Sequence, residues 1–243
     1  MKIAVISDIH GNMEALNAVL EDIEENSCDK IYCLGDYAMA GPEPSKAVEF
    51  FINQNYTMIQ GNTDLMIATY SDDLYNFLKD KAPVMAEALK NDKEILNKEQ
   101  KEFLKNLPPQ KLIIEDGVKI LLVHGSPRKN NEDILPDTPL AEVEKMLEGV
   151  DADIILCGHT HIPCGLQTSD KKTVVNVGSV GRPFTENPEA CYLTILIKNG
   201  SCLFEHHFVK YDKEKAAEKL KKRNFVGAEK LANTLINPKE RHF

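Results

Sequence analysis

Short apolar runs alternate with amphipathic segments over the first 60 residues. The runs are nearly continuous in apolar and β-branched residues, which predicts strands buried on both faces: 2–7, 30–35 and 56–60. Apolar residues recur at helical spacing over 12–25, where Asn12 is a suitable N-cap, and over 44–54. This strand–helix alternation predicts a mostly parallel sheet in an α/β fold.

The alternation stops near residue 64. Residues 64 to about 108 are rich in Leu, Ala, Lys, Glu and Asn and contain no strand-like run. We expect a helical insert there, which is either a lid beside a site or additional helical packing. Strands resume at 111–115 and 119–125, joined by a turn at Asp116-Gly117, and a helix is expected over 139–150.

The last third of the chain has a different pattern. A strand and a loop are expected over 153–161. Three further segments are typical of antiparallel strands: 173–181, 190–200 and 202–211. The tail, 213–243, predicts two helices. We therefore expect one domain over residues 1–243, with the insert and the tail as appendages.

Composition and charge narrow the class of protein. The chain has 243 residues and a net charge of −9, which argues against binding a nucleic-acid polymer but allows a small anionic substrate. No apolar run approaches the length of about 18 residues that spans a membrane. The apolar run at the start is too short for a signal peptide, so we expect a cytoplasmic protein. The sequence leaves the oligomeric state open.

The six cysteines show no CxxC spacing. In a cytoplasmic chain of this size, such cysteines are typically reduced residues of the core. A structural zinc knuckle is the alternative interpretation of these residues.

Residues able to bind a metal follow five of the predicted strands. They are Asp8, His10, Asp36, Asn62, His124, His159 and His161. Ligands of open α/β sheets bind outside the carboxyl ends of the strands, so these side chains should converge. A single histidine after a strand is usually a hydrogen-bonded loop or core residue. Four of the seven histidines lie at strand ends, however, and this joint pattern indicates a metal site. We assign no function to the other three histidines, His206, His207 and His242.

The set of ligands contains imidazoles, carboxylates and an amide but no thiolate. Such a set suits manganese, iron, zinc, cobalt or nickel better than calcium, and we expect manganese. Seven ligands exceed the need of one ion and suit two ions about 3.5–4 Å apart that share a carboxylate. Two divalent ions would outweigh the two carboxylates, so the site would attract a phosphate group.

Five motifs in this order resemble the calcineurin-like metallophosphoesterase superfamily: "SDIHGN", "GDYAMAGPEP", "GNTD", "VHGSP" and "GHTHIP". They span residues 7 to 163. A further segment, "NVGSVGRP" (176–183), resembles the small bacterial and archaeal phosphodiesterase branch. The resemblance implies a four-layer α/β/β/α sandwich of two mixed β-sheets flanked by helices.

The resemblance also implies a role for each ligand. Asp8, His10 and His161 would hold the first metal ion. Asn62, His124 and His159 would hold the second. Asp36 would bridge the two ions, and a metal-bridging hydroxide would attack phosphorus.

The third motif departs from the family pattern. Many members have a histidine where this chain has Thr63, and that histidine protonates the leaving oxygen. A threonine hydroxyl is a poor proton donor at neutral pH. We therefore expect a phosphodiesterase that prefers diesters or aryl esters, as in the small phosphodiesterase branch, which also lacks the histidine. Thr63 and three other residues are candidates for substrate binding: Asn12, Arg128 and Arg182. Helix capping by Asn12 and salt bridges of the two arginines are the alternatives.

Two other functions are compatible with the family. One is a phosphomonoesterase or dinucleoside polyphosphate hydrolase, in which basic residues of the 64–108 insert would hold additional phosphates. The other is a non-catalytic scaffold, as in a retromer subunit that resembles this fold but has altered metal-site residues. All seven ligand positions are filled in this chain, which argues against the scaffold.

Overall fold

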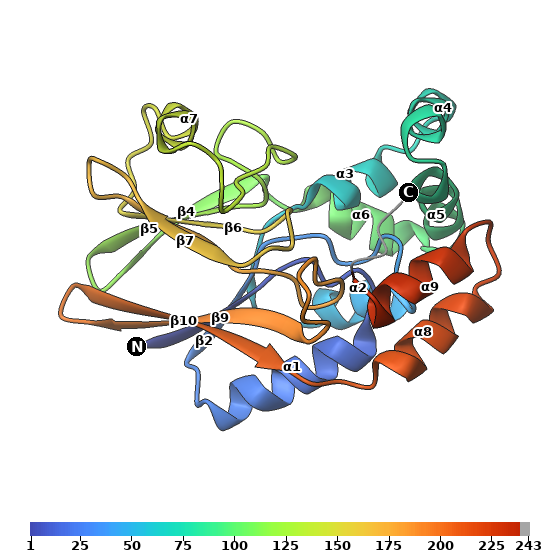
Figure 1. Cartoon of the computed structure of the whole chain (residues 1–243), viewed down its shortest axis with the longest axis horizontal. Helices are drawn as coiled ribbons and strands as arrows, with labels where there is room; N and C mark the ends of the chain where they lie inside the picture. Colours follow the sequence, from blue (N-terminus) through green and yellow to red (C-terminus); the bar gives the residue numbers. More distant parts are fainter. Residues whose placement is uncertain (239–243) are drawn as a thin grey trace.

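The computed structural model of the protein describes residues 1–238, and within them ten strands and nine helices form two flanked sheets (Figure 1). The strands are β1 (Lys2–Ile6), β2 (Lys30–Cys33), β3 (Thr57–Met58), β4 (Gln110–Glu115), β5 (Val118–Val123), β6 (Ile154–Cys157), β7 (Cys164–Gln167), β8 (Thr173–Asn176), β9 (Ala190–Lys198) and β10 (Ser201–Val209). The helices are α1 (Met13–Glu25), α2 (Pro44–Ile52), α3 (Asn62–Ala68), α4 (Asp72–Lys81), α5 (Pro83–Ile95), α6 (Lys98–Asn106), α7 (Leu140–Met146), α8 (Lys213–Lys222) and α9 (Ala228–Ile236).

Both sheets are mixed and contain five strands each. The first has the order β10-β9-β1-β2-β3, in which β1, β2 and β3 are parallel and the β9–β10 hairpin is antiparallel. The second has the order β4-β5-β6-β8-β7, with parallel β5, β6 and β8 and antiparallel edge strands. The helical and strand patterns of the first 60 residues are confirmed.

The expectation of an antiparallel strand within 173–181 was wrong in part. β8 pairs parallel with β6 and antiparallel only with β7, a strand that the sequence pattern did not predict. The β7–β8 hairpin carries the chain back, so that β8 can enter the sheet beside β6 in the same direction. Pairing direction depends on this connection, which the apolar pattern of β8 alone does not encode.

Side chains of the central strands alternate between two cores. In β1, Ile3 and Val5 pack between the two sheets, whereas Ala4 and Ile6 pack against helices. β5 and β6 alternate in the same way between the intersheet core and α7. Helices such as α1 therefore cover the outer face of the first sheet and α7 covers that of the second. This arrangement confirms the four-layer sandwich (Figure 1).

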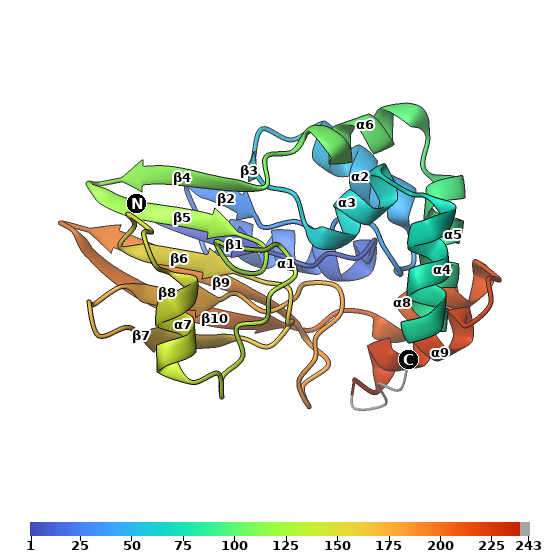
Figure 2. The same ribbon diagram turned by 90° about the horizontal axis from the view of Figure 1, so that it is seen from above.

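The insert predicted over 64–108 consists of α3, α4, α5 and α6. Figures 1 and 2 show these helices at the same end of the molecule as α8 and α9, the two helices predicted in the tail. Residues 239–243 of that predicted tail, with His242, lie outside the described residues.

The cysteines are free thiols, and Cys33, Cys157 and Cys191 are buried. The expectation of core residues therefore holds for these three, whereas Cys28, Cys164 and Cys202 are only partly buried. Among the described residues, no helix combines the length and the apolar character needed to cross a membrane.

Candidate metal centre

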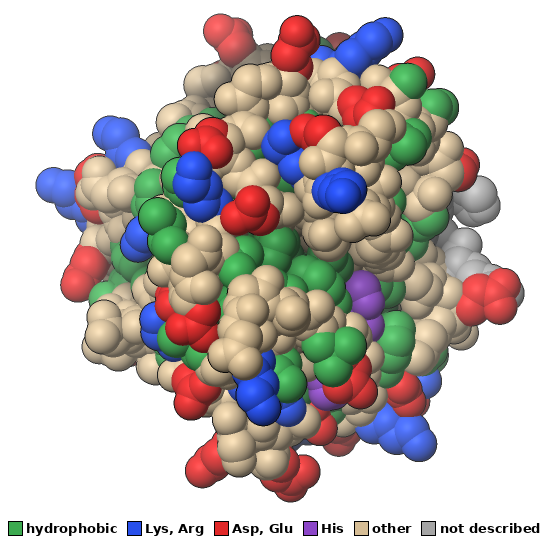
Figure 3. Space-filling model, turned by 90° about the vertical axis from the view of Figure 1, so that its left-hand side faces the viewer, with side chains coloured by type: hydrophobic (Ala, Val, Ile, Leu, Met, Phe, Trp, Pro, Cys, Tyr) green, Lys and Arg blue, Asp and Glu red, His purple; other side chains and the backbone are tan. Residues whose placement is uncertain are grey.

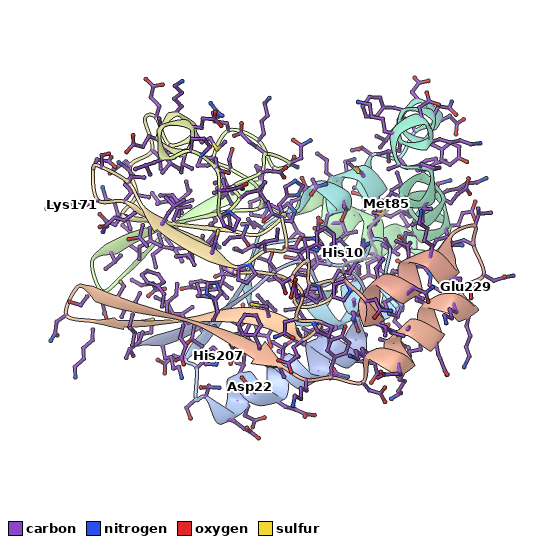
Figure 4. The ribbon with its side chains drawn as sticks, in the orientation of Figure 1. His10, Asp22, Met85, Lys171, His207 and Glu229 are labelled. Atoms are coloured by element: carbon purple, nitrogen blue, oxygen red, sulfur yellow. The ribbon has the colours of Figure 1, made fainter. Side chains whose placement is uncertain are left out.

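The predicted ligands meet in the interior, where the strands give way to helices; His10 is labelled there in Figure 4. Potential ligand atoms of Asp8, His10 and His161 lie within 4.8 Å of one another, and those of Asp8, Asp36 and His124 form a second such group. All five of these residues are buried. The convergence follows from parallel strands, because their carboxyl ends share one edge of a sheet.

Asn62 and His159 complete the second group. Oδ1 of Asn62 lies 2.9 Å from Nε2 of His124 and 3.0 Å from Nδ1 of His159. Asn62 is the first residue of α3, which begins after the short loop that follows β3, and its amide oxygen faces the two imidazoles. The structure thus brings all seven predicted ligands together.

Both carboxylates lie between the two groups of ligands. Oδ2 of Asp36 is 3.7 Å from Nε2 of His10 and 3.5 Å from Nε2 of His124. Oδ1 of Asp8 is 3.9 Å and 3.8 Å from the same two nitrogens. Asp8 belongs to both groups of potential ligand atoms, and the bridging role of Asp36 stays a prediction.

Three imidazoles are oriented by backbone carbonyls. Nδ1 of His10 lies 2.6 Å from the backbone oxygen of Met39. Nδ1 of His124 lies 2.7 Å from the backbone oxygen of Leu34, and Nδ1 of His161 lies 2.5 Å from that of Arg182. A carbonyl oxygen only accepts, so each Nδ1 carries the hydrogen and each Nε2 points into the centre. Imidazoles that bind metals in proteins are typically held in this way.

The backbone of the centre is locally strained. Five of the seven residues have a positive φ, between 47° and 66°: Asp8, His10, Asp36, His159 and His161. A left-handed conformation costs a non-glycine residue free energy and is concentrated at functional sites. Gly61 is required for a different reason, because a Cβ atom there would lie 2.0 Å from Oδ1 of Asp36.

The residues of the first group fit a cation. Oδ1 of Asp8 is buried and has no hydrogen-bond partner, although Nε2 of His161 lies 3.1 Å away. The Nε2 atoms of His10 and His161 are 3.3 Å apart. A divalent ion between these atoms would satisfy the carboxylate and both nitrogens, and this mixed N/O set suits a transition metal.

Burial and neighbouring charges compete in setting the pKa values of the buried groups in the centre. Burial alone would raise the pKa of the Asp8 carboxyl, but His161 and His124 outweigh it and hold the pKa at about 2. Burial also opposes ionisation of Asp36, and His124 and His10 hold its pKa well below the ordinary value. Both groups are therefore carboxylates at neutral pH. For His10, burial is the larger effect and lowers the pKa to about 3, so the ring is neutral.

The candidates for substrate binding occupy different surroundings. Arg182 is buried, and burial lowers its pKa to about 10 against the opposing effect of Asp36 and Asp8, so the guanidinium is charged at neutral pH. Arg128 forms a salt bridge with Glu132 over 2.6 Å. Arg128 therefore makes the salt bridge that was expected as the alternative to substrate binding. A role of either arginine toward a substrate stays a prediction.

Asn12 and Thr63, the other two candidates for substrate binding, make contacts with the backbone and with Asp36. Asn12 caps α1, since its Oδ1 accepts from the amide of Ala15, and its Nδ2 donates to the oxygen of Gly181. Thr63 donates its backbone amide to Oδ1 of Asp36 over 2.9 Å. The Thr63 hydroxyl is buried without a hydrogen-bond partner.

Sequence reasoning missed Asp64, the last residue of "GNTD". Its buried carboxylate accepts from the backbone amides of Asp36 (2.8 Å), Tyr37 (3.0 Å) and Gly61 (2.9 Å). It therefore fixes the strand ends that carry Asp36 and Asn62. The sequence contained one signal for this role: an acidic residue lies two positions after a predicted ligand, in the first turn of a helix.

The segment "NVGSVGRP" forms hydrogen bonds with the loop that carries Asp8. Oγ of Ser179 and the amide of Gly181 both donate to the backbone oxygen of Asp8, at 2.9 Å each. The amide of Val180 donates to the oxygen of Ser7. This segment supports the positive φ of Asp8 and places Arg182 beside the centre.

Comparisons with known proteins agree with this geometry. The family model of the calcineurin-like phosphoesterase superfamily domain matches residues 1–200. The uncharacterized protein MJ0912 of Methanocaldococcus jannaschii is 34% identical, over 90% of this chain and 92% of that protein.

Two solved structures are similar at 25% sequence identity. A metallophosphoesterase from Sphaerobacter thermophilus has a TM-score of 0.78 and covers 98% of both chains. The hypothetical protein PH1004 from Pyrococcus horikoshii OT3 has a TM-score of 0.82, with 96% of this chain and 97% of that chain covered. The protein therefore belongs to the calcineurin-like phosphoesterase superfamily, a family of metal-dependent phosphoesterases, and this membership supports a phosphoester hydrolase.

Proposed function

We propose that the protein is a two-metal phosphodiesterase that hydrolyses a small organic or nucleotide-like phosphoester. The observation that carries the proposal is the convergence of seven predicted ligands, in which the carboxylates of Asp8 and Asp36 lie between the imidazoles of His10 and His124. Asp8, His10 and His161 would hold the first ion and Asn62, His124 and His159 the second, with Asp36 between them. Manganese is the expected metal, with iron, zinc, cobalt and nickel as alternatives.

When bound, the two ions supply Lewis acidity that activates water and neutralises charge on the phosphoryl oxygens. The side chains of the protein adjust this charge. Asn62 contributes a neutral oxygen where a carboxylate would cancel positive charge. Arg182 adds a buried guanidinium whose planar fork can bind phosphoryl oxygens in pairs.

Thr63 restricts the leaving group. It occupies the motif position where many family members have a histidine, and its hydroxyl cannot donate a proton efficiently at neutral pH. Esters with an acidic leaving alcohol do not need that proton. Diesters and aryl esters are therefore the expected substrates.

The charge of the chain favours a small substrate over a polymer. Figure 3 shows Lys and Arg side chains interspersed with Asp and Glu on one face, without a broad basic surface. The net charge of −9 also opposes attraction of a nucleic-acid backbone.

A panel of substrates tests the proposal. Chelator-treated protein is reloaded with Mn²⁺ and assayed on bis-p-nitrophenyl phosphate, p-nitrophenyl phosphate, an alkyl monoester and a dinucleoside polyphosphate. We expect kcat/KM on the diester to exceed that on the matched monoester, and chelator treatment to abolish both. A preference for monoesters or dinucleoside polyphosphates would replace this proposal with the alternative enzyme. Protein that binds no metal and hydrolyses none of these would be a scaffold.

A further inference from the structure

His159 is oriented differently from the other three imidazoles of the centre. Those rings point Nδ1 at backbone carbonyls and Nε2 inward. His159 points Nδ1 inward, 3.0 Å from Oδ1 of Asn62, and its Nε2 lies 3.3 Å from Oδ1 of Asp133. We propose that Asp133 is the positioning residue of His159 and holds it ready to bind the second metal ion. This inference rests on the two-metal site proposed above.

The chemistry follows from the two nitrogens of imidazole. A neutral ring has one N–H group and one lone pair, and their places can exchange. Oδ1 of Asn62 only accepts hydrogen bonds and by itself would favour the hydrogen on Nδ1, whereas the charged carboxylate of Asp133 beside Nε2 favours the hydrogen there. Nδ1 then keeps its lone pair for the metal. Carboxylates in this position also raise the basicity of the imidazole ligand.

The loop after β5 holds Asp133 in place. On one side, Glu132 pairs with Arg128 over 2.6 Å and accepts a hydrogen bond from Ser126. On the other side, Ile134 is buried in the core beneath α7. Asp133 is thus fixed between two anchors, although 61% of its side chain is exposed. The ion pair of Arg128 therefore shapes the loop that reaches His159.

Exposure explains why this ring needs a carboxylate. The side chain of His159 is 18% exposed, against 3% for His10, 0% for His124 and 5% for His161. A ring at the rim has fewer buried neighbours to fix its orientation. Binding of the second ion should therefore depend on the surface loop that carries Asp133, whereas the side chains that would hold the first ion are buried in the core.

The test compares two substitutions in the same loop. Asp133→Asn removes the carboxylate, and Asp137→Asn makes the same charge change at another exposed residue. Metal-free protein is titrated with Zn²⁺ alone, in competition with a chelating dye, so that no substrate is involved. We expect Asp133→Asn to weaken the second zinc ion by roughly 10–100-fold and Asp137→Asn to leave it near the wild-type value. Asp133→Glu should restore part of the lost affinity.

A spectroscopic readout separates positioning from charge. In zinc-loaded protein, ¹⁵N spectra of the imidazoles should show a single Nε2–H tautomer for His159. Asp133→Asn should populate a second tautomer or a second ring orientation, while the spectra of His10 and His161 stay unchanged.

The outcomes distinguish the two proposals. If the wild type binds two zinc ions and both variants bind them equally well, the inference about Asp133 is overturned and the two-metal function stands. If the wild type binds fewer than two ions, both are overturned. Because Asp133 is exposed, the variant should keep the wild-type melting temperature in metal-free form.

Discussion

Nε2 of His10 lies 3.3 Å from Nε2 of His161, although each ring already directs Nδ1 at a carbonyl oxygen. Two nitrogen lone pairs at this distance repel each other unless a proton or a cation lies between them. Burial lowers the pKa of His10 to about 3, so a proton on this ring does not relieve the repulsion at neutral pH. A metal ion would do so.

Removal of metal should therefore destabilise the fold. An ion present at 100 times its Kd adds about 2.7 kcal/mol to the stability of the state that binds it. For a chain of this size, that corresponds to a fall in Tm of roughly 5–10 °C after chelation. Thermal melts with and without chelator measure the effect, and Mn²⁺ but not Ca²⁺ should restore the higher Tm. Identical melts would contradict a metal centre.

Asn62→Ala should weaken the second metal ion and lower kcat without unfolding the protein. The amide oxygen lies between His124 and His159, so its loss removes one ligand and leaves both imidazoles. Metal content after gel filtration should fall from two ions toward one. Asn55→Ala, at an exposed residue, is the matched control. Unchanged metal content and rate would exclude Asn62 as a ligand.

Thr63→His should raise activity on esters with poor leaving groups. A general acid contributes roughly 10²–10⁴-fold where the leaving oxygen needs a proton. The gain should appear in kcat/KM for an alkyl monoester and be small for an aryl diester. Thr63→Val removes the hydroxyl, keeps its shape and should behave like the wild type, because that hydroxyl has no hydrogen-bond partner. The absence of any gain would mean that the missing acid does not restrict the substrate.

The two arginines should differ in their effect on catalysis. Arg182→Gln removes a buried charge beside Asp8 and Asp36 but keeps the backbone oxygen that orients His161. We expect kcat/KM to fall by roughly 10–100-fold, the equivalent of about 1.5–3 kcal/mol for a charged hydrogen bond, with metal content preserved. Arg128→Gln, which breaks the pair with Glu132, should lower kcat/KM less than Arg182→Gln does, because Ser126 still holds Glu132 and the loop that carries Asp133. Equal effects of the two substitutions would argue against a phosphate contact of Arg182.

Metal binding should release a proton. Burial alone would lower the pKa of His124, but Asp36 and Asp8 outweigh it and raise the pKa to about 10 in the metal-free protein. The second ion must displace this proton, because only the neutral ring binds metal. Affinity for that ion should therefore rise about tenfold per pH unit between about pH 6 and about pH 8. Zinc titration calorimetry in buffers of different ionisation enthalpy counts the protons, and buffer-independent heats would refute the exchange.

The sequence by itself determined the set of candidate ligands. Strand periodicity places Asp8, Asp36 and His124 directly after apolar runs, and parallel strands bring their carboxyl ends to one edge. Because local periodicity and this geometric rule suffice, the parallel strands of the first sheet and the cluster of candidate ligands were predictable. The family motifs added the sandwich of two sheets.

Only the tertiary structure decided how the ligands are held. The carbonyls that orient His10, His124 and His161 lie 29, 90 and 21 residues away in the chain, and no local pattern encodes such pairs. The parallel pairing of β8 and the approach of Asp133 to His159 depend likewise on how distant segments pack. The sequence specifies which side chains are present at each position. The tautomers and orientations of the imidazoles, and the charges of the buried groups, depend on long-range contacts in a buried, low-dielectric interior.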